Sequence, residues 1–217
     1  MLEELKKQVV AVAKDSDRNG MCKHKSGNFS MFDPASGYVV ITPSGIAREV
    51  LTERDVCVLD LDANVVERNS EAKPSSESLM HLAVYRARTE IRAIVHTHAR
   101  YSTAFAIMNR PVPAIVYESA YLGKCGTIPV APYGRPGTPE LAENVAETLR
   151  NADCCLMESH GAIAVGVSME DAYLKAQYTE EISELYYITL AAGCGKEPKV
   201  LEEEELQKWA YPEEIKM

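Results

Sequence analysis

The chain has 217 residues, of which 46% are hydrophobic and 25% charged, and its formal net charge at pH 7 is -9. This size and composition predict one globular domain, and an acidic chain without a basic stripe is a poor candidate for nucleic-acid binding. No apolar stretch approaches the roughly 20 residues that a membrane-spanning helix requires.

The N-terminal segment and the cysteines both favour a cytoplasmic setting. Residues 1–7 are amphipathic and have no long apolar core, so they are not typical of a secretory signal. The six cysteines include no C-x-x-C pair, and the adjacent Cys154 and Cys155 suit a buried strand better than a disulfide framework. We therefore expect a reducing compartment and no membrane partner.

Helix and strand patterns alternate in the first half of the chain. Apolar residues at helical spacing predict a helix from about residue 2 to 19, ended by an Asn-Gly pair. Residues 25–30 have the composition of a small polar loop. Apolar runs then predict three strands, the last two forming a hairpin, at residues 38–41, 56–60 and 65–67. The next helix is expected to begin at Ser75 or Ser76 as N-cap.

The second half alternates in the same way. An apolar run over residues 91–95 predicts a strand, and a short helix is expected over 102–108. Two longer helices are expected, one over 139–150 with Thr138 as its cap, and one from Ser168 to about residue 192. Further short strands are predicted at residues 113–116, 127–130, 154–157 and 162–167. Short turns join many of these strands, which favours a mixed or mainly antiparallel sheet covered by helices.

A His-Thr-His sequence ends one of these strands and is the first candidate for metal ligands. His96 and His98 are two residues apart on an extended chain, so they point to one side with Cα atoms about 7 Å apart. Two imidazoles so placed can converge on one ion, although polar residues at a strand end are the simpler explanation for the pair alone. Glu77 at a helix start and His160 after another apolar run complete a set of four zinc ligands.

Three small polar segments have the chemistry of a phosphate pocket. They are Ser26-Gly27-Asn28, Thr42-Pro43-Ser44-Gly45 and Pro74-Ser75-Ser76. Each offers hydroxyl or amide donors beside a Gly or Pro turn, and the third precedes a helix, where backbone N–H groups favour an anion. Gly and Ser also mark ordinary loops. The third segment, however, is followed directly by Glu77, which indicates a phosphorylated small molecule that chelates the metal.

These motifs resemble the class II aldolase and adducin-head family, and within it the L-fuculose-phosphate aldolase branch. The resemblance covers roughly residues 5 to 190, with the motifs in the family's order. They are Ser26-Gly27-Asn28-Phe29-Ser30, Ile41-Thr42-Pro43-Ser44-Gly45, Pro74-Ser75-Ser76-Glu77, His96-Thr97-His98-Ala99 and Ser159-His160-Gly161, with Pro113-Ala114-Ile115-Val116-Tyr117 and Ala131-Pro132-Tyr133 in addition. Any one of them is weak, whereas five in order are specific.

The resemblance implies a three-layer α/β/α fold with a central, mainly antiparallel sheet. It implies a single domain over residues 1–217, with the residues from about 196 on as a C-terminal tail, and a homotetramer with sites at subunit interfaces. It implies one Zn²⁺ ion per subunit, bound by Glu77, His96, His98 and His160. It implies a phosphate pocket formed by Gly27, Asn28, Ser44, Gly45, Ser75 and Ser76. The ligands alone do not distinguish Zn²⁺ from Mn²⁺ or Co²⁺.

The implied reaction is the reversible cleavage of L-fuculose 1-phosphate, or a related ketose 1-phosphate, to dihydroxyacetone phosphate and L-lactaldehyde. Breaking the carbon–carbon bond leaves an enediolate, which a Lewis acid stabilises. Glu77 is the expected proton shuttle, since a carboxylate can leave the metal when substrate chelates it. The resemblance also implies a catalytic Tyr117 acting across a subunit boundary, and a C-terminal tyrosine, for which Tyr211 is the candidate unless it only packs against the protein.

Departures from the family pattern leave the sugar open. Lys25 replaces a threonine beside the phosphate loop, where it would either bind phosphate or point to solvent. Pro136 replaces an aromatic residue near the aldehyde end of the substrate. A deoxyribulose-phosphate aldolase is therefore an alternative, as is a dehydratase or a decarboxylase that uses Glu118 as an acid.

Other members of the family fit less well. L-Ribulose-5-phosphate 4-epimerases share the scaffold and the metal, but they carry Asp at the position of Glu77 and an acidic residue near Leu122. A non-enzymatic adducin-like module would be expected to lack the metal ligands, and a zinc protease would need an H-E-x-x-H motif.

His24 is expected at the surface, and His81 either braces a ligand or is an ordinary helix residue.

Overall fold

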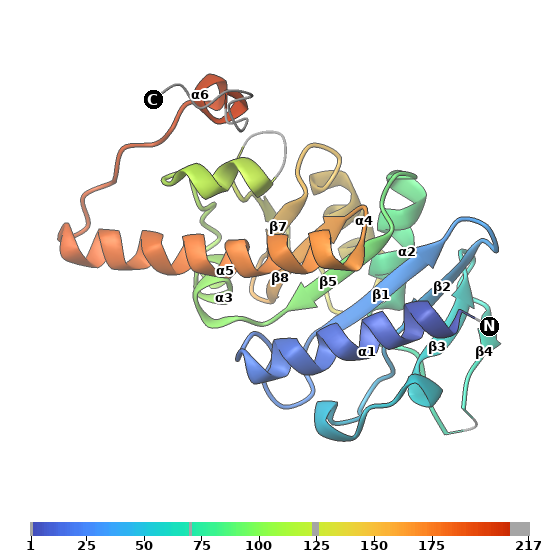
Figure 1. Cartoon of the computed structure of the whole chain (residues 1–217). Helices are drawn as coiled ribbons and strands as arrows, with labels where there is room; N and C mark the ends of the chain where they lie inside the picture. The colour runs from blue at the N-terminus through green and yellow to red at the C-terminus, as the bar shows by residue number, and fades with distance from the viewer. Residues whose placement is uncertain (1, 70, 123–125, 209–217) are drawn as a thin grey trace, which may run out of the picture.

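A single sheet runs through the centre of the molecule (Figure 1). The structure is a computed structural model that describes residues 2–69, 71–122 and 126–208. Within these residues, eight strands form the sheet in the order β4-β3-β2-β1-β5-β8-β7-β6. All neighbours are antiparallel except β6 and β7. The strands are β1 (Asn28–Asp33), β2 (Tyr38–Ile41), β3 (Cys57–Asp60), β4 (Val65–Glu67), β5 (Ala93–Thr97), β6 (Val130–Ala131), β7 (Cys154–Met157) and β8 (Gly161–Gly166).

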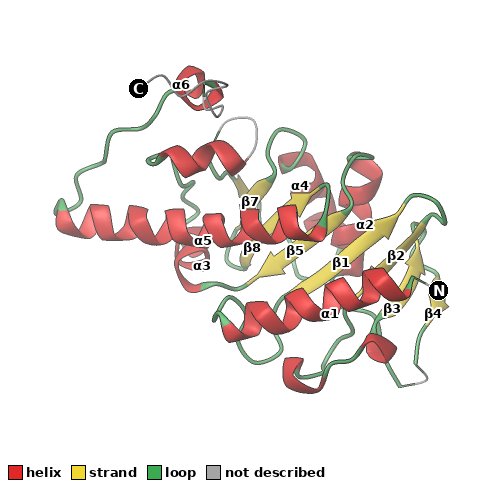
Figure 2. Cartoon of the chain, viewed as in Figure 1, coloured by secondary structure: helices red, strands yellow, loops and turns green. Residues whose placement is uncertain are grey.

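Helices cover both faces of the sheet (Figure 2). Residues of α1, α3 and α5 pack in the core on one face, and residues of α2 and α4 pack in the core on the other. The helices are α1 (Glu3–Arg18), α2 (Ser78–Ala87), α3 (Arg100–Ile107), α4 (Pro139–Thr148), α5 (Met169–Ala192) and α6 (Glu203–Gln207). This arrangement confirms the expected α/β/α fold with a mainly antiparallel sheet.

Alternate residues of each central strand belong to the two different cores. In β5, Ala93 and Val95 pack with α1, α3 and α5, whereas Ile94 packs with α2 and α4. In β8, Ala164 and Ile163 divide in the same way. Because both faces are covered, every residue of these two strands is buried, which explains their nearly continuous apolar sequences.

Two helix starts confirm the predicted caps. The Thr138 side chain accepts a hydrogen bond from the Leu141 N–H at 3.4 Å, and Pro139 is the first residue of α4. The Ser168 hydroxyl accepts from the Asp171 N–H at 3.1 Å at the start of α5. Both side chains satisfy N–H groups that have no partner within the helix.

The predicted cap of α2 is wrong. Glu77 occupies the N-cap position, and its side chain makes no capping bond. Ser75 lies in the turn before the helix, where its hydroxyl accepts from the Glu77 N–H at 3.3 Å and its carbonyl accepts from the Ser78 N–H. The Ser76 N–H donates to the Ser44 hydroxyl at 3.0 Å. The two serines therefore connect loops, and the Glu77 side chain is left to make other contacts.

Two further segments differ from expectation. Asn28 and Ser30 were expected in a loop but belong to β1, because pairing with both β2 and β5 buries this polar sequence. Residues 113–116, all described, form no strand, and the contact observed beside them is a single bridge between Val112 and Ile128. Prolines in both segments lack the N–H that a strand ladder requires, so the predicted strand over 127–130 is also reduced, to the two residues of β6.

The cysteines and the helices were also the subject of predictions from composition. The described cysteines carry free thiols, namely Cys22, Cys57, Cys154, Cys155 and Cys194. None of the helices in the described ranges combines the length and apolar character needed to cross a membrane.

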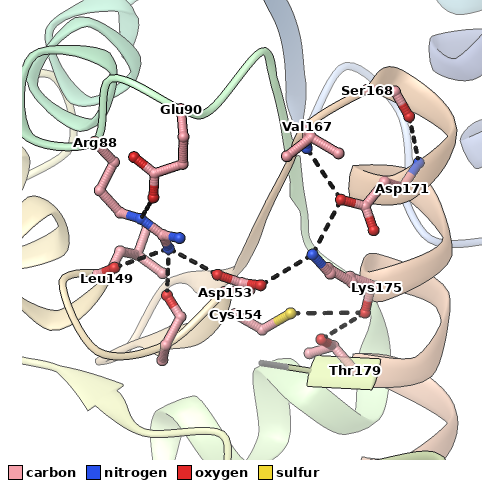
Figure 3. A network of polar contacts seen from close by, with 11 residues as sticks. Arg88, Glu90, Leu149, Asp153, Cys154, Val167, Ser168, Asp171, Lys175 and Thr179 are labelled. Atoms are coloured by element: carbon pink, nitrogen blue, oxygen red, sulfur yellow. Dashed lines mark hydrogen bonds and ion pairs between the residues drawn. The ribbon is translucent and has the colours of Figure 1, made fainter. Parts of the chain in front are cut away.

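A chain of polar contacts joins α2 and α5, which lie on opposite faces of the sheet, beside the start of β7 (Figure 3). Arg88, directly after α2, donates to the Leu149 and Ala152 carbonyls and to Asp153 Oδ1 at 2.8 Å. The other oxygen of Asp153 accepts from Lys175 on α5 at 2.9 Å. Burial raises the pKa of Asp153, but hydrogen bonds from Lys175 and Arg88 outweigh this effect and hold it below 3.8. Asp153 therefore links two cations that come from opposite faces of the sheet.

We predict that Asp153→Asn lowers the free energy of unfolding by about 1–3 kcal/mol at pH 7, because both cations lose their counter-charge. The stabilisation by Asp153 is complete above its unfolded pKa and is lost as pH falls through its lower folded pKa. The difference between variant and wild type should therefore shrink below pH 3.8. Urea unfolding across this pH range measures it.

Glu147→Gln is the matched control, since Glu147 pairs with Arg150 at 2.6 Å on the exposed surface of the molecule. Its effect should stay below about 1 kcal/mol. Equal effects of the two substitutions would contradict the structural importance of Asp153.

Candidate metal and anion site

Four side chains from separate parts of the chain converge near one end of the central strands. They are Glu77, His96, His98 and His160, and their ligand atoms all lie within 4.8 Å of one another. Glu77 directly precedes α2, His96 lies in β5, His98 follows that strand, and His160 lies between β7 and β8. The structure thus brings together all four residues that the sequence predicted as metal ligands.

Strand pairing explains this convergence. β5 lies between β1 and β8, so that His96 is opposite Asn28 on one side and opposite Ile163 on the other. The short connection between β7 and β8 then carries His160 to the end of β5. The three imidazole rings have centroids 4.8 to 4.9 Å apart. The group is therefore positioned by backbone pairing at the centre of the sheet.

The contacts and burial of the histidines suit metal binding. His96 Nδ1 lies 2.8 Å from the Ala162 carbonyl, which can only accept, so Nδ1 carries a proton and Nε2 is directed toward the other three side chains of the group. Burial lowers the pKa of His98 to about 3 and the pKa of His160 to about 4. These two rings are neutral at pH 7 and can donate lone pairs to an ion.

Glu77 supplies the negative charge of the group and is only 6% exposed. Burial alone would raise the pKa of its carboxyl group, but His96, His160 and a hydrogen bond from Asn28 hold it well below its usual range. Glu77 Oε2 lies 3.2 Å from His96 Nε2, and Oε1 lies 3.3 Å from His160 Nε2. Asn28 Nδ2 donates to Oε2 at 2.8 Å, whereas Oε1 has no hydrogen-bond donor among the residues described.

These residues fit a divalent metal ion. Three imidazole nitrogens and one carboxylate oxygen are ligands that Zn²⁺ uses in proteins. The buried Glu77 Oε1 supports this fit, because a desolvated carboxylate oxygen without a donor is costly unless a cation compensates it. The carbonyl partner of His96 Nδ1 is also the kind of contact that orients metal-binding histidines.

The group opens into a cavity of about 400 Å³. Glu77, His98 and His160 line this cavity, and so do all six residues predicted for the phosphate pocket: Gly27, Asn28, Ser44, Gly45, Ser75 and Ser76. Lys25 and Pro136, which depart from the family pattern, line it as well. The candidate metal ligands and the candidate phosphate donors therefore face one shared space, with a lysine beside the donors.

Hydrogen bonds between the loops give this cavity a defined wall. The Ser44 hydroxyl donates to the Pro74 carbonyl at 3.2 Å and accepts from the Ser76 N–H at 3.0 Å. Arg48, only 3% exposed, donates through Nη2 to the Gly27 carbonyl at 2.6 Å and to the Ser26 carbonyl at 3.3 Å. Sequence reasoning missed Arg48, because it follows the motifs at no recognisable spacing and its hydrogen bonds go to backbone carbonyls that no sequence pattern reveals.

Other predicted residues lie elsewhere. Tyr117 begins the 3-10 helix Tyr117–Leu122, is 53% exposed, and is not among the described residues that line the cavity. The Glu118 side chain raises the pKa of Tyr117 by hydrogen bonding. Tyr211 lies outside the described residues. His24 is exposed, as expected, whereas His81 is completely buried.

Known proteins resemble this chain over most of its length. The family model for the Class II Aldolase and Adducin N-terminal domain matches residues 7–187. The 5-deoxy-D-ribulose 1-phosphate aldolase of Bacillus thuringiensis serovar kurstaki is 36% identical over 97% of this chain and 95% of that protein. The L-fuculose phosphate aldolase of Escherichia coli O157:H7 is 39% identical over 87% of this chain and 85% of that protein. A solved structure of L-fuculose 1-phosphate aldolase matches with a TM-score of 0.87 and 35% identity, covering 94% of this chain and 93% of that one.

Gly27 and Gly45, the glycines of two predicted phosphate loops, should differ in their tolerance of a larger residue. Gly27 and Gly45 both have positive φ, +75° and +77°, but a Cβ on Gly27 would lie 2.7 Å from the His96 carbonyl, whereas a Cβ on Gly45 would meet nothing within 4 Å. Gly45→Ala should therefore lower the free energy of unfolding by about 1–2 kcal/mol through backbone strain alone. Gly27→Ala should cost at least about twice as much and should also weaken Zn²⁺ binding.

Denaturant unfolding of the metal-free variants and Zn²⁺ titration measure the two effects. If Gly27→Ala and Gly45→Ala proved equally stable and bound Zn²⁺ equally well, the close contact between the loop and β5 would be contradicted.

Proposed function

This chain belongs to the Class II Aldolase and Adducin N-terminal domain family and is an aldolase, a carbon–carbon lyase, for which we propose a ketose 1-phosphate as substrate. The first candidate is L-fuculose 1-phosphate, cleaved reversibly to dihydroxyacetone phosphate and L-lactaldehyde. One observation carries this proposal: the Glu77–histidine group and the phosphate loops line the same cavity. That arrangement suits a small substrate with a phosphate at one end and metal-binding oxygens beside it.

We propose Zn²⁺ as the metal, held by Glu77, His96, His98 and His160. A bound zinc ion supplies Lewis-acid stabilisation of the negative charge that develops on substrate oxygens when the carbon–carbon bond breaks. The lowered pKa values of His98 and His160 and the ionised Glu77 carboxylate support this proposal, and the Ala162 carbonyl orients the ring of His96.

Glu77 is proposed as the group that accepts and returns the proton. Its carboxyl group is ionised at pH 7, and its Oε1 faces no donor among the described residues, so that oxygen has a free lone pair for a proton. Its Oε2 keeps the hydrogen bond from Asn28. The carboxylate can therefore hold a proton at one oxygen while the other keeps its orientation.

The phosphate is proposed to bind Gly27, Asn28, Ser44, Gly45, Ser75 and Ser76. The hydroxyl groups and loop N–H groups around the cavity supply neutral donors. We propose that Lys25 adds the positive charge that a phosphate dianion favours, since it lines the same cavity. This would make substrate affinity depend on salt concentration.

We propose that Tyr117 completes the site of a neighbouring subunit in a homotetramer. Its exposure and its position outside the lining of its own chain's cavity support this proposal. Exposed apolar and aromatic side chains nearby also suit a subunit interface, namely Tyr121, Leu185, Tyr187 and Ile188. The phenol would exchange a proton with the departing carbonyl oxygen.

Tyr211 is proposed as a second catalytic tyrosine, and the described part of the C-terminal tail contacts the segment before Tyr117. The Leu201 N–H donates to the Ala114 carbonyl at 2.8 Å, and Leu206 is only 8% exposed. The tail therefore docks against the segment that leads to Tyr117. We propose that residues 1–217 form a single domain. Its C-terminal tail begins at about residue 196.

A 5-deoxypentulose 1-phosphate is the second candidate substrate. The 5-deoxy-D-ribulose 1-phosphate aldolase matches 97% of this chain, a larger share than the 87% matched by the L-fuculose phosphate aldolase. The two sugar phosphates share the phosphate end and differ in the aldehyde that they release. Pro136 lines the cavity and is the residue whose contact with that aldehyde would distinguish them.

We predict that the zinc-loaded enzyme releases dihydroxyacetone phosphate from L-fuculose 1-phosphate, and that chelation abolishes this activity and added Zn²⁺ restores it. Glu77→Gln should lower kcat by about 100-fold or more, because it removes the proton acceptor. Glu147→Gln, an exposed carboxylate on α4, is the control and should be unaffected. A coupled assay for dihydroxyacetone phosphate measures the rates, and higher kcat/KM with 5-deoxy-D-ribulose 1-phosphate would select the second candidate.

A mixing experiment tests the position of Tyr117. Tyr117→Phe and Glu77→Gln should each be nearly inactive alone, whereas refolding them together should restore activity to at most about a quarter of wild type, because some sites then combine intact residues from two chains. Tyr38→Phe, which changes a tyrosine on β2 that does not line the cavity, should stay active. Failure of the mixture to regain any activity would contradict a shared site.

A further inference from the structure

A buried line of hydrogen bonds connects α2 and β1 to the Glu77 carboxylate. We propose that His81 is a positioning residue for the reaction, acting through Asn28 to fix the orientation of Glu77. This inference rests on the role of Glu77 in the proposed function. It concerns the geometry of the carboxylate before any substrate or metal is bound.

The contacts form one continuous path. The Tyr85 hydroxyl lies 2.8 Å from the Ser30 hydroxyl, which lies 2.7 Å from His81 Nδ1. His81 Nε2 lies 2.5 Å from Asn28 Oδ1, and Asn28 Nδ2 lies 2.8 Å from Glu77 Oε2. Tyr85 and His81 come from α2 and Ser30 and Asn28 from β1, so the path crosses between the helix and the strand three times before it reaches Glu77.

The direction of every hydrogen bond in this path can be assigned. Asn28 Oδ1 can only accept, so His81 Nε2 must carry a proton and donate. Burial lowers the pKa of His81 to about 3, so the ring is neutral at pH 7 and its Nδ1 must accept from the Ser30 hydroxyl. The Ser30 oxygen then accepts from Tyr85. The donors therefore all point along the path toward the carboxylate of Glu77.

This direction stabilises the orientation in which the NH₂ end of the Asn28 amide faces Glu77. An amide side chain can turn over with little change of shape, which exchanges its donor and acceptor ends. Turned over, Asn28 would place its carbonyl oxygen against a carboxylate oxygen and its NH₂ group against the protonated His81 Nε2. The ionised Glu77 carboxylate can only accept, so Asn28 presents Nδ2 to it, and a proton on His81 Nε2 stabilises this orientation from the other end of the amide.

Burial makes this arrangement rigid. His81 and Ser30 are completely buried, and Tyr85 and Asn28 are 2% and 6% exposed. A break between His81 and Asn28 would leave polar groups without partners in the core. The path therefore holds Glu77 Oε2 in place, while Oε1 has no donor among the described residues. One oxygen is anchored, and the other is available for a ligand or a proton.

Asn28 would then have two functions, phosphate binding and the orientation of Glu77. The sequence indicated Asn28 as a phosphate donor, and it does line the cavity. Its Nδ2 already donates one hydrogen to Glu77, and an amide nitrogen has a second hydrogen to donate. Asn28 can thus contact the phosphate and orient Glu77 with the same group, so that it lies between the two halves of the site.

The test compares His81→Leu with His81→Gln in the zinc-loaded enzyme. Leu fills the space without a donor, whereas the Gln amide can still donate to Asn28. We expect His81→Leu to lower kcat by about 10-fold or more with KM changed by less than about twofold, and His81→Gln to retain activity within about threefold of wild type. Tyr85→Phe, which alters only the far end of the path, should also retain activity. Equal losses in the Leu and Gln variants would overturn the proposal.

Two measurements do not depend on activity. In metal-free wild type, the ¹⁵N NMR signals of His81 should show the tautomer protonated at Nε2, and a proton on Nδ1 would overturn the proposal even if His81→Leu does not fold. Zn²⁺ titration should show affinity at least about 10-fold weaker for His81→Leu than for His81→Gln, and equal affinities would count against it. If wild type cleaved neither sugar phosphate, the proposed function would fail, while these two measurements would still decide the role of His81.

Discussion

The antiparallel pairing of β5 with β8 is the constraint on which the site depends. It places the Ala162 carbonyl against His96 Nδ1, which requires a proton on that nitrogen and fixes the direction of the ring. β1 on the other side of β5 brings Asn28 opposite His96. A slip of one residue in this register would turn His96 to the opposite face of the sheet. The extensive apolar burial on both faces is what prevents such a slip, so the cores on the two faces also determine the geometry of the polar site.

Several buried polar side chains of the site lie close together beside a sheet whose central strands are mainly apolar. Glu77, His96 and Asn28 are all nearly inaccessible to water, and each would be costly to bury alone. Each is compensated by a specific partner: a carbonyl for His96, an amide donor for Glu77, and His81 for Asn28. For these three residues, the one buried side-chain oxygen or nitrogen without a hydrogen-bond partner among the described residues is Glu77 Oε1. A polar group of this kind favours one arrangement strongly, since any alternative leaves several partners unsatisfied.

The sequence predicted the elements whose signals are local. Thr138 and Ser168 cap helices because their side chains act within one turn, and these were predictable. β1 was missed because its polar residues are buried by neighbours distant in the chain, which no local pattern reveals. The four candidate metal ligands could be predicted, because histidine and glutamate are typical metal-binding residues and they stand in short, recognisable sequence motifs. The role of His81 was left open, because its ring direction depends on a strand contact that only the folded chain supplies.

Arg48 has a consequence for how an anion would meet the phosphate loop. The groups of a loop that repel a phosphate are its carbonyl oxygens, and Arg48 holds the oxygens of Ser26 and Gly27 with a guanidinium group that does not line the cavity. The loop is therefore held in its conformation by an internal cation before any ligand arrives. Little conformational entropy remains to be lost at that loop on binding, so affinity there should reflect the charge and fit of the ligand more than the ordering of the protein.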